Sequence, residues 1–182
     1  WVDHFPFVPF WQVLTWGFLH DLMDLGHILW NMLFLFFLGT MLEGLIGSRR
    51  FLVAYMGGLL LAGVGTLIAG LVPYLMASGP LQPVGWMEMQ TTIGASGAVA
   101  TVVIAMAALR PKTQLILVII PVTLKVVAFI FVGMDLFGLL RNLNAGGGDN
   151  VAHFAHLLGA GWGYLIVRKG WIYRDPFEAL QE

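Results

Sequence analysis

Long apolar segments dominate this sequence and limit what it can fold into. The chain has 182 residues, of which 59% are hydrophobic and only 10% are charged, whereas soluble domains carry about 25% charged residues. An α-helix needs about 20 apolar residues to cross roughly 30 Å of hydrocarbon. Five segments are long enough or nearly so: 27–46, 51–73, 93–109, 122–140 and 153–167. The sequence therefore predicts an all-α, polytopic membrane helix bundle.

The basic residues predict the orientation of this bundle. Eight of the nine Lys and Arg residues fall on one side of an alternating five-span path: Arg49, Arg50, Arg110, Lys112, Lys125, Arg168, Lys169 and Arg174. Only Arg141 falls on the other side. Because cytosolic connections are rich in Lys and Arg, we expect a cytosolic C-terminus. Proline suits the first turn of a helix, so we also expect Pro121 to begin the fourth span and residues 113–120 to lie at the interface.

Several polar side chains fall at one predicted depth in the outer half of the membrane. Ser96, His156 and Asn31 each lie roughly 18 to 24 Å of helix from a cytosolic helix end, and His27 is one turn beyond Asn31. A serine and a histidine on two helices at one level can form a nucleophile and its base. His27 and Asn31, at positions i and i+4, share a helix face. Both side chains can donate hydrogen bonds to a developing oxyanion.

Small residues beside these side chains would let the helices approach closely. Gly94 and Gly97 flank Ser96, and Gly159 and Gly163 follow His156. Small residues are typical of close helix crossings in membranes. A second stripe, at Ala54, Gly58, Ala62, Thr66 and Gly70, indicates that segment 51–73 is a central helix. Packing alone would also explain a membrane serine among glycines, and a histidine near a helix end is often only an interfacial residue.

Other chemistries have weaker support in the sequence. There is no cysteine, which excludes disulfides and thiolate sites. His153 and His156 could form a metal pair, but no carboxylate accompanies them on that helix and HExxH is absent, so we expect no metal and no cofactor. Asp135, near the outer end of its span, is expected to cap or hydrate that end. A net charge of −1 gives no reason to expect a nucleic-acid partner.

Three motifs together resemble the rhomboid family of intramembrane serine proteases. "GASG" around Ser96 is similar to the family's Gly-x-Ser-Gly motif, and "HILWN" (27–31) to its His-x-x-x-Asn motif. "AHLLGAGWG" (155–163) is similar to the family's last-helix motif, and "WQVLTWGFLH" (11–20) looks like the loop that half-enters the membrane. The family core has six helices, the first of which precedes that loop. The resemblance therefore implies that five are present here and the first is missing.

The resemblance implies an activity and a set of site residues. The expected function is a serine endopeptidase that cleaves transmembrane helices with a dyad of Ser96 as nucleophile and His156 as base. His27, Asn31 and the Ser96 backbone N–H would hold the oxyanion. Gly94, Gly97, Gly159 and Gly163 would support helix packing. The alternatives are an inactive rhomboid-like protein that binds or escorts membrane helices, and an unrelated channel or transporter.

The resemblance also carries expectations for domain layout and location. Residues 1–182 would form one rhomboid protease domain: an outer membrane-associated loop (1–26), five helices (27–167) and a cytosolic tail (168–182). The expected partners are transmembrane protein substrates and the lipid bilayer, in a bacterial inner membrane; the oligomeric state is left open. Two departures stand out. Gln12 replaces a frequent arginine, and Ala100 replaces the tyrosine often found under the histidine ring, so Trp162 or a neighbouring aromatic is expected to orient His156.

Overall fold

A computed structural model describes most of the chain. It covers residues 11, 15–19, 25–76, 94–117, 119–145 and 150–174. Most of the expected outer segment 1–26, including Gln12, lies outside these residues, as does the end of the tail beyond 174. Residues 77–93 and 146–149, which belong to the expected outer loops, also lie outside them.

The described elements are almost all helical, which confirms the all-α class. A short 3₁₀ turn, η1 (Trp16–Phe18), precedes a continuous helical stretch of α2 (Leu25–Phe34), the π-helical η2 (Leu35–Gly39) and α3 (Thr40–Ile46). The remaining elements are α4 (Ser48–Met76), α5 (Ser96–Leu109), β1 (Gln114–Leu117), β2 (Ile120–Thr123), α6 (Leu124–Ala145), α7 (Asn150–Arg168) and η4 (Trp171–Tyr173).

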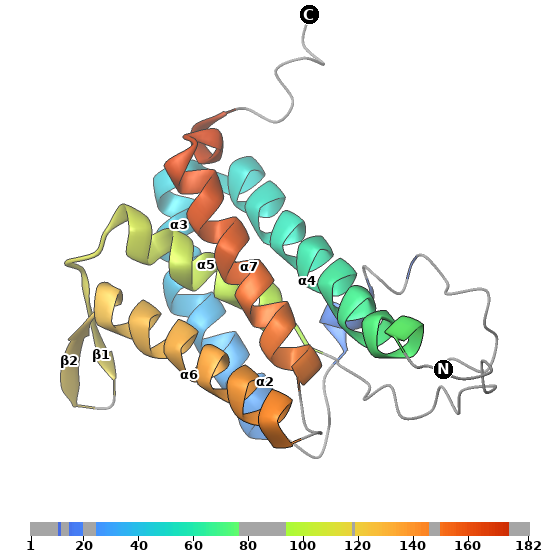
Figure 1. Cartoon of the computed structure of the whole chain (residues 1–182). Coiled ribbons are helices and arrows are strands. Elements are labelled where there is room, and N and C mark those ends of the chain that lie inside the picture. The colour runs from blue at the N-terminus through green and yellow to red at the C-terminus, as the bar shows by residue number, and fades with distance from the viewer. Residues whose placement is uncertain are drawn as a thin grey trace, which may run out of the picture.

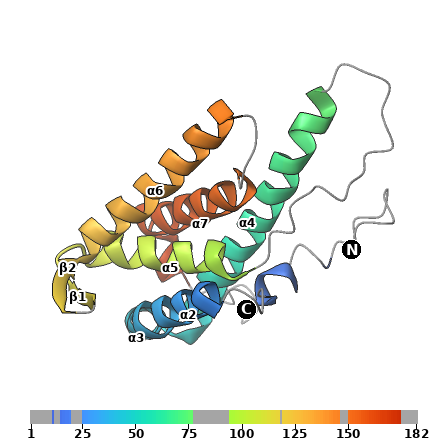
Figure 2. The same cartoon turned by 90° about the horizontal axis from the view of Figure 1, so that it is seen from below.

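Helix α5 lies at the centre of the bundle. Its residues 97–107 are all buried, and it packs against α7, α4, α6 and the α2–α3 stretch. In both ribbon views α7 lies between α4 and α6, while α5 lies between α7 and the α2–α3 stretch (Figures 1 and 2). An apolar helix with no polar face suits this position, since every side of it contacts protein.

Helix α4 is peripheral, so the expectation of a central helix at 51–73 was wrong. Its small-residue stripe does face the bundle: Ala54, Gly58 and Ala62 are buried. The opposite face exposes large apolar side chains such as Leu52, Leu60 and Val64. Small residues therefore mark the face that α5 and α7 approach, which a peripheral helix can also have.

Backbone-to-backbone contact joins α5 to α7. A Cβ atom on Gly159 would overlap the carbonyl oxygen of Gly97, and one on Gly163 would overlap that of Thr101. The fully buried Thr101 donates a hydrogen bond from its hydroxyl to the Gly159 carbonyl oxygen at 2.8 Å. Since only glycine leaves room for such an approach, these positions set the distance between the two helices.

A β-hairpin occupies the segment where a helix start was expected. Strands β1 and β2 pair antiparallel, with Ile116 opposite Pro121. Pro121 therefore lies in a strand rather than in the first helical turn, and α6 begins only at Leu124. Each strand of a two-stranded ribbon has one edge that faces no other strand. Proline has no backbone N–H, and at such an edge its absence removes no hydrogen bond between the strands. The proline does separate the two apolar segments, as expected.

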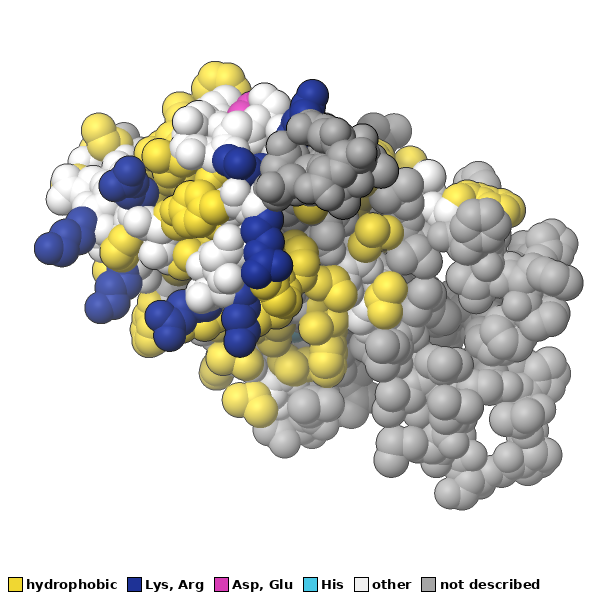
Figure 3. Space-filling view, turned by 90° about the horizontal axis from the view of Figure 1, so that it is seen from above, with side chains coloured by type: hydrophobic (Ala, Val, Ile, Leu, Met, Phe, Trp, Pro, Cys, Tyr) yellow, Lys and Arg dark blue, Asp and Glu magenta, His cyan; other side chains and the backbone are white. Residues whose placement is uncertain are grey.

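The outer surface of the bundle is apolar, and one end of it is basic. Large side chains on α6 are exposed, among them Phe129 (79%), Met134 (69%) and Phe137 (70%). A view onto the end where α4 begins and α7 finishes shows Lys and Arg side chains gathered there above a hydrophobic flank (Figure 3). By length and composition, one helical stretch in the described part of the chain, Leu25–Ile46, suffices to span a membrane; α5 is apolar but has 14 residues.

The contact at Gly159 predicts that a glycine-to-alanine substitution destabilises the protein at this position but not at a nearby exposed one. Gly159→Ala should lower the melting temperature in detergent, because forcing two backbones apart costs about 1–3 kcal/mol. Gly161→Ala is the matched control, since nothing lies within 4 Å of a Cβ there; on an exposed helix face alanine should leave stability unchanged or raise it. Thermal unfolding followed by tryptophan fluorescence measures both. Equal melting temperatures for the two variants would contradict the contact.

Candidate active site

Ser96 is the first residue of α5. Its side chain is half-buried. The residue before it, Ala95, is the N-cap of the helix, and Gly94, with a φ of +126°, precedes that N-cap. The first turn of a helix has backbone N–H groups without partners inside the helix, and the helix dipole favours negative charge there. A hydroxyl at this position is therefore placed beside donors that can hold an oxyanion.

The side chains of His27 and Asn31 lie beside the residue that leads into this turn. A Cβ on Gly94 would come within 2.9 Å of His27 Cε1 and 3.8 Å of Asn31 Nδ2. Asn31 is buried, at 6% exposure. The Gly94 N–H donates to the Trp16 carbonyl oxygen at 3.3 Å, which ties η1 to the same point. Two side chains of α2 thus border the start of α5.

Ser96 and His156 occupy neighbouring points on two touching helices. Gly97, the residue after Ser96, lies in backbone contact with Gly159 and close to the carbonyl oxygen of Ala155, the residue before His156. Among the described residues, the His156 ring forms its hydrogen bond through Nδ1, with Asp135 as the partner rather than Ser96. The structure therefore brings the two helix segments together.

Asp135 of α6 joins the two histidines of α7, a contact that the sequence analysis missed. Its carboxylate oxygen Oδ1 lies 2.8 Å from His153 Nδ1 and 2.9 Å from His156 Nδ1. The residue is 7% exposed, so the expectation that it caps or hydrates a helix end was wrong. An ionisable residue within an apolar span was the available signal. Depth along a helix, however, does not say which neighbour a side chain faces.

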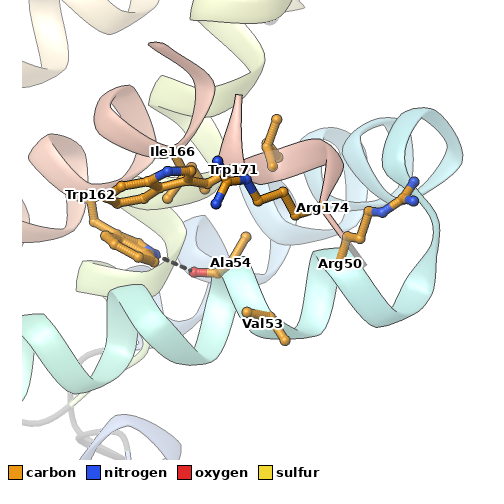
Figure 4. A pocket seen from close by; sticks show the side chains of 8 residues that line it. Arg50, Val53, Ala54, Trp162, Ile166, Trp171 and Arg174 are labelled. Atoms are coloured by element: carbon orange, nitrogen blue, oxygen red, sulfur yellow. Dashed lines mark hydrogen bonds between the residues drawn. The ribbon is translucent and has the colours of Figure 1, made fainter. Parts of the chain in front are cut away.

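Of the two aromatic partners expected for the histidine ring, Trp162 or a neighbouring aromatic, the structure has the second. The Phe131 ring on α6 lies beside the His156 ring, with centroids 5.7 Å apart and planes inclined by 44°. Trp162 has other partners. Its indole N–H donates to the Ala54 carbonyl oxygen at 3.1 Å, and its ring borders a pocket that Arg50 and Arg174 also line, as Figure 4 shows. Asp135 and Phe131, both on α6, therefore contact the His156 ring.

A helical bundle with an apolar exterior and a serine, histidine and asparagine cluster matches the class of intramembrane proteins known as rhomboids. The sequence pattern of the Rhomboid domain matches residues 9–173. The chain belongs to the rhomboid family and is an integral membrane protein.

One curated relative is similar to nearly the whole of this chain. It is 29% identical over 176 residues to "RHOMBOID-like protein 12, mitochondrial" of Arabidopsis thaliana. The match covers 93% of this chain and 50% of that protein, so the chain spans half the length of its relative. No solved structure matches this chain.

The conformation of Gly94 predicts a stability effect at the site. Gly94→Ala should lower the melting temperature, since a φ of +126° strains an L-residue by about 1–3 kcal/mol and the added Cβ would meet the His27 ring. Gly44→Ala is the control, because a Cβ there meets nothing within 4 Å. Differential scanning fluorimetry compares the two. If both variants melted together, the turn before Ser96 would not have this conformation.

Proposed function

We propose that this chain is an intramembrane serine endopeptidase, with Ser96 as nucleophile and His156 as general base. The observation that carries the proposal is the Gly97–Gly159 backbone contact, because it holds the serine and histidine segments side by side while His27 and Asn31 border the same turn. Nucleophile, base and oxyanion donors on separate helices are the parts that acyl transfer requires.

The proposed reaction begins with attack of Ser96 Oγ on a substrate carbonyl carbon. The hydroxyl proton passes to His156 Nε2, and the resulting oxyanion accepts hydrogen bonds from Asn31, His27 and the Ser96 backbone N–H. Collapse of this intermediate breaks the peptide bond, and His156 returns the proton to the leaving amine. Water then hydrolyses the acyl-enzyme by the same steps, with His156 again as base.

Asp135 adds a third member to the proposed dyad. A ring that donates from Nδ1 to a carboxylate carries its proton on Nδ1, which leaves Nε2 free to accept the serine proton. The 2.9 Å contact between Asp135 Oδ1 and His156 Nδ1 supports this role. The carboxylate also stabilises the imidazolium that forms during attack. We therefore propose Asp135 as a positioning residue.

The proposed substrates are transmembrane helices of other proteins. A hydrogen-bonded helix in lipid hides its carbonyl groups from attack, so cleavage requires a segment that unwinds, such as one rich in Gly, Ala or Pro. The proposed orientation has a cytosolic C-terminus and rests on the basic residues at one end of the bundle. A bacterial inner membrane remains part of the proposal. A rhomboid-like protein that binds helices without cleaving them is the alternative.

The nucleophile assignment predicts the loss of two activities in one variant. Ser96→Ala should abolish both cleavage of a single-span test substrate and labelling by a fluorophosphonate probe, with an unchanged melting temperature. Ser48→Ala is the control, since Ser48 begins α4 at the basic end of the bundle. Gel-based cleavage and in-gel fluorescence measure the two activities. Labelling of Ser96→Ala at the wild-type rate would disprove the assignment, and a wild type that neither cleaves nor labels would favour the helix-binding alternative.

The positioning role of Asp135 predicts a change in turnover rather than in substrate binding. Asp135→Asn keeps an oxygen that can accept a hydrogen bond but removes the charge that stabilises the imidazolium. We expect kcat to fall by about 100-fold, the lower end of what a positioned base contributes, with KM nearly unchanged. Glu43→Gln, the same chemical change on α3, is the control.

The melting temperature separates positioning from structural support. If Asp135 positions His156, Asp135→Asn should lower kcat while the melting temperature and KM stay near those of wild type. A residue that only supports the fold would lower activity and the melting temperature together. That second pattern would remove Asp135 from the proposed mechanism.

A further inference from the structure

One carboxylate oxygen serves two imidazoles in this structure, which is more than orientation of a base requires. Asp135 Oδ1 bonds the Nδ1 atoms of both His153 and His156, and the three ligand atoms lie within 4.8 Å of one another. A single histidine on Asp135 would suffice to set the tautomer of the base. The second imidazole instead competes with the base for the same acceptor.

The three groups are a donor set that zinc prefers. Imidazole nitrogen and carboxylate oxygen bind Zn²⁺ at about 2.0–2.2 Å, often as three protein ligands with water in the fourth tetrahedral position. Neighbouring ligands of a tetrahedral ion lie about 3.3 Å apart at such bond lengths. The two Asp135–histidine pairs, now 2.8 and 2.9 Å apart, would each open by about 0.4 Å to admit the ion. The two ring nitrogens, which lie within 4.8 Å of each other, would take up the same ligand separation.

Packing holds both rings in position for this contact. His153 and His156 are three residues apart on α7, so they project from the same face of that helix. The His153 ring lies against Gly138 of α6, where a Cβ would overlap it, and Phe131 lies beside the His156 ring. Fixed rings lower the entropy lost on binding.

The three ligands of the cluster differ in burial. The side chains of His153 and His156 are 25% and 20% exposed, whereas that of Asp135 is 9% exposed. A mostly buried carboxylate therefore supplies the negative charge, and the two imidazoles are the more accessible ligands. Zinc is favoured over Mg²⁺ and Ca²⁺, because those harder cations prefer oxygen ligands.

We propose that Asp135, His153 and His156 form a reversible Zn²⁺ site that inhibits the enzyme. Without metal, the His156 proton resides on Nδ1 and Nε2 accepts the serine proton. When Zn²⁺ takes the Nδ1 lone pair, that same proton resides on Nε2, with no net proton released. An Nε2–H group cannot accept a proton from Ser96. The inhibition, unlike the binding, rests on the proposed function.

Zinc binding is tested on the full chain without an affinity histidine tag, purified in detergent and treated with chelator. Competition with a fluorescent zinc indicator should give one site of equal affinity in wild type and Ser96→Ala. His153→Ala and Asp135→Asn should each weaken binding by at least about tenfold, since even indirect partners of zinc ligands have effects of this size. Mg²⁺ should not displace Zn²⁺. Absence of saturable binding, or unchanged affinity in His153→Ala, would overturn the site.

Inhibition is tested with the same proteins in the cleavage assay. Zn²⁺ should stop wild-type cleavage over the concentration range in which it binds, and chelator should restore it. His153→Ala retains Ser96 and His156, and its cleavage should need at least about tenfold more Zn²⁺ for half-inhibition. Saturated wild-type enzyme that still cleaves would overturn the inhibitory role. If wild type cleaved nothing even without metal, the proposed protease function would fail, while the binding assay would still decide the zinc site.

Discussion

Contact between the backbones of Gly97 and Gly159 is the constraint on which the candidate site depends. No side chain separates α5 from α7 at this point, because a Cβ on Gly159 would overlap the Gly97 carbonyl oxygen. The residues adjacent to this contact are Ser96 on one helix and Ala155 followed by His156 on the other. A serine Oγ and an imidazole nitrogen must come within about 3 Å for proton transfer. Helices packed through larger side chains, with axes 8–10 Å apart, would hold them further from each other.

Buried polar groups reinforce this contact at two levels. Thr101 lies five residues after Ser96 on α5, and its hydroxyl donates to the Gly159 carbonyl oxygen, so it links the same two helices. At the level of the site, Asp135 links α6 to α7 through two histidines. An unpaired polar group in an apolar interior is costly. Each of these bonds therefore restricts how the helices can rotate, in addition to any chemical role.

Asp135 connects the proposed catalysis to the proposed inhibition. Its hydrogen bond keeps the His156 proton on Nδ1, which suits a base. The same oxygen also holds His153, and that pairing completes a zinc donor set. The metal-free and the zinc-bound forms of the His156 ring carry the same single proton, on Nδ1 in the first and on Nε2 in the second. His153 has no role in the proposed hydrolysis. In the proposed inhibition it is a zinc ligand beside His156.

Much of the candidate site could be read from motifs and counting. Residue spacing along each apolar segment predicts one common depth for Ser96, His27, Asn31 and His156, because a helix rises by a fixed amount per residue. Glycines at 94, 97, 159 and 163 indicated close approach, and the structure has the backbone contacts at Gly97, Gly159 and Gly163. Pro121 was misread, because a proline that ends one segment is equally compatible with a strand edge and a helix start.

The sequence by itself determined the helical class and the family. Only the tertiary structure decided which side chains face one another. The rotation of each helix about its axis depends on how all its neighbours pack, and no local pattern in α6 records it. Asp135 therefore read as a helix-end residue in the sequence, and only the packing of α6 against α7 turned it toward His153 and His156. The same packing put α5, rather than α4, at the centre.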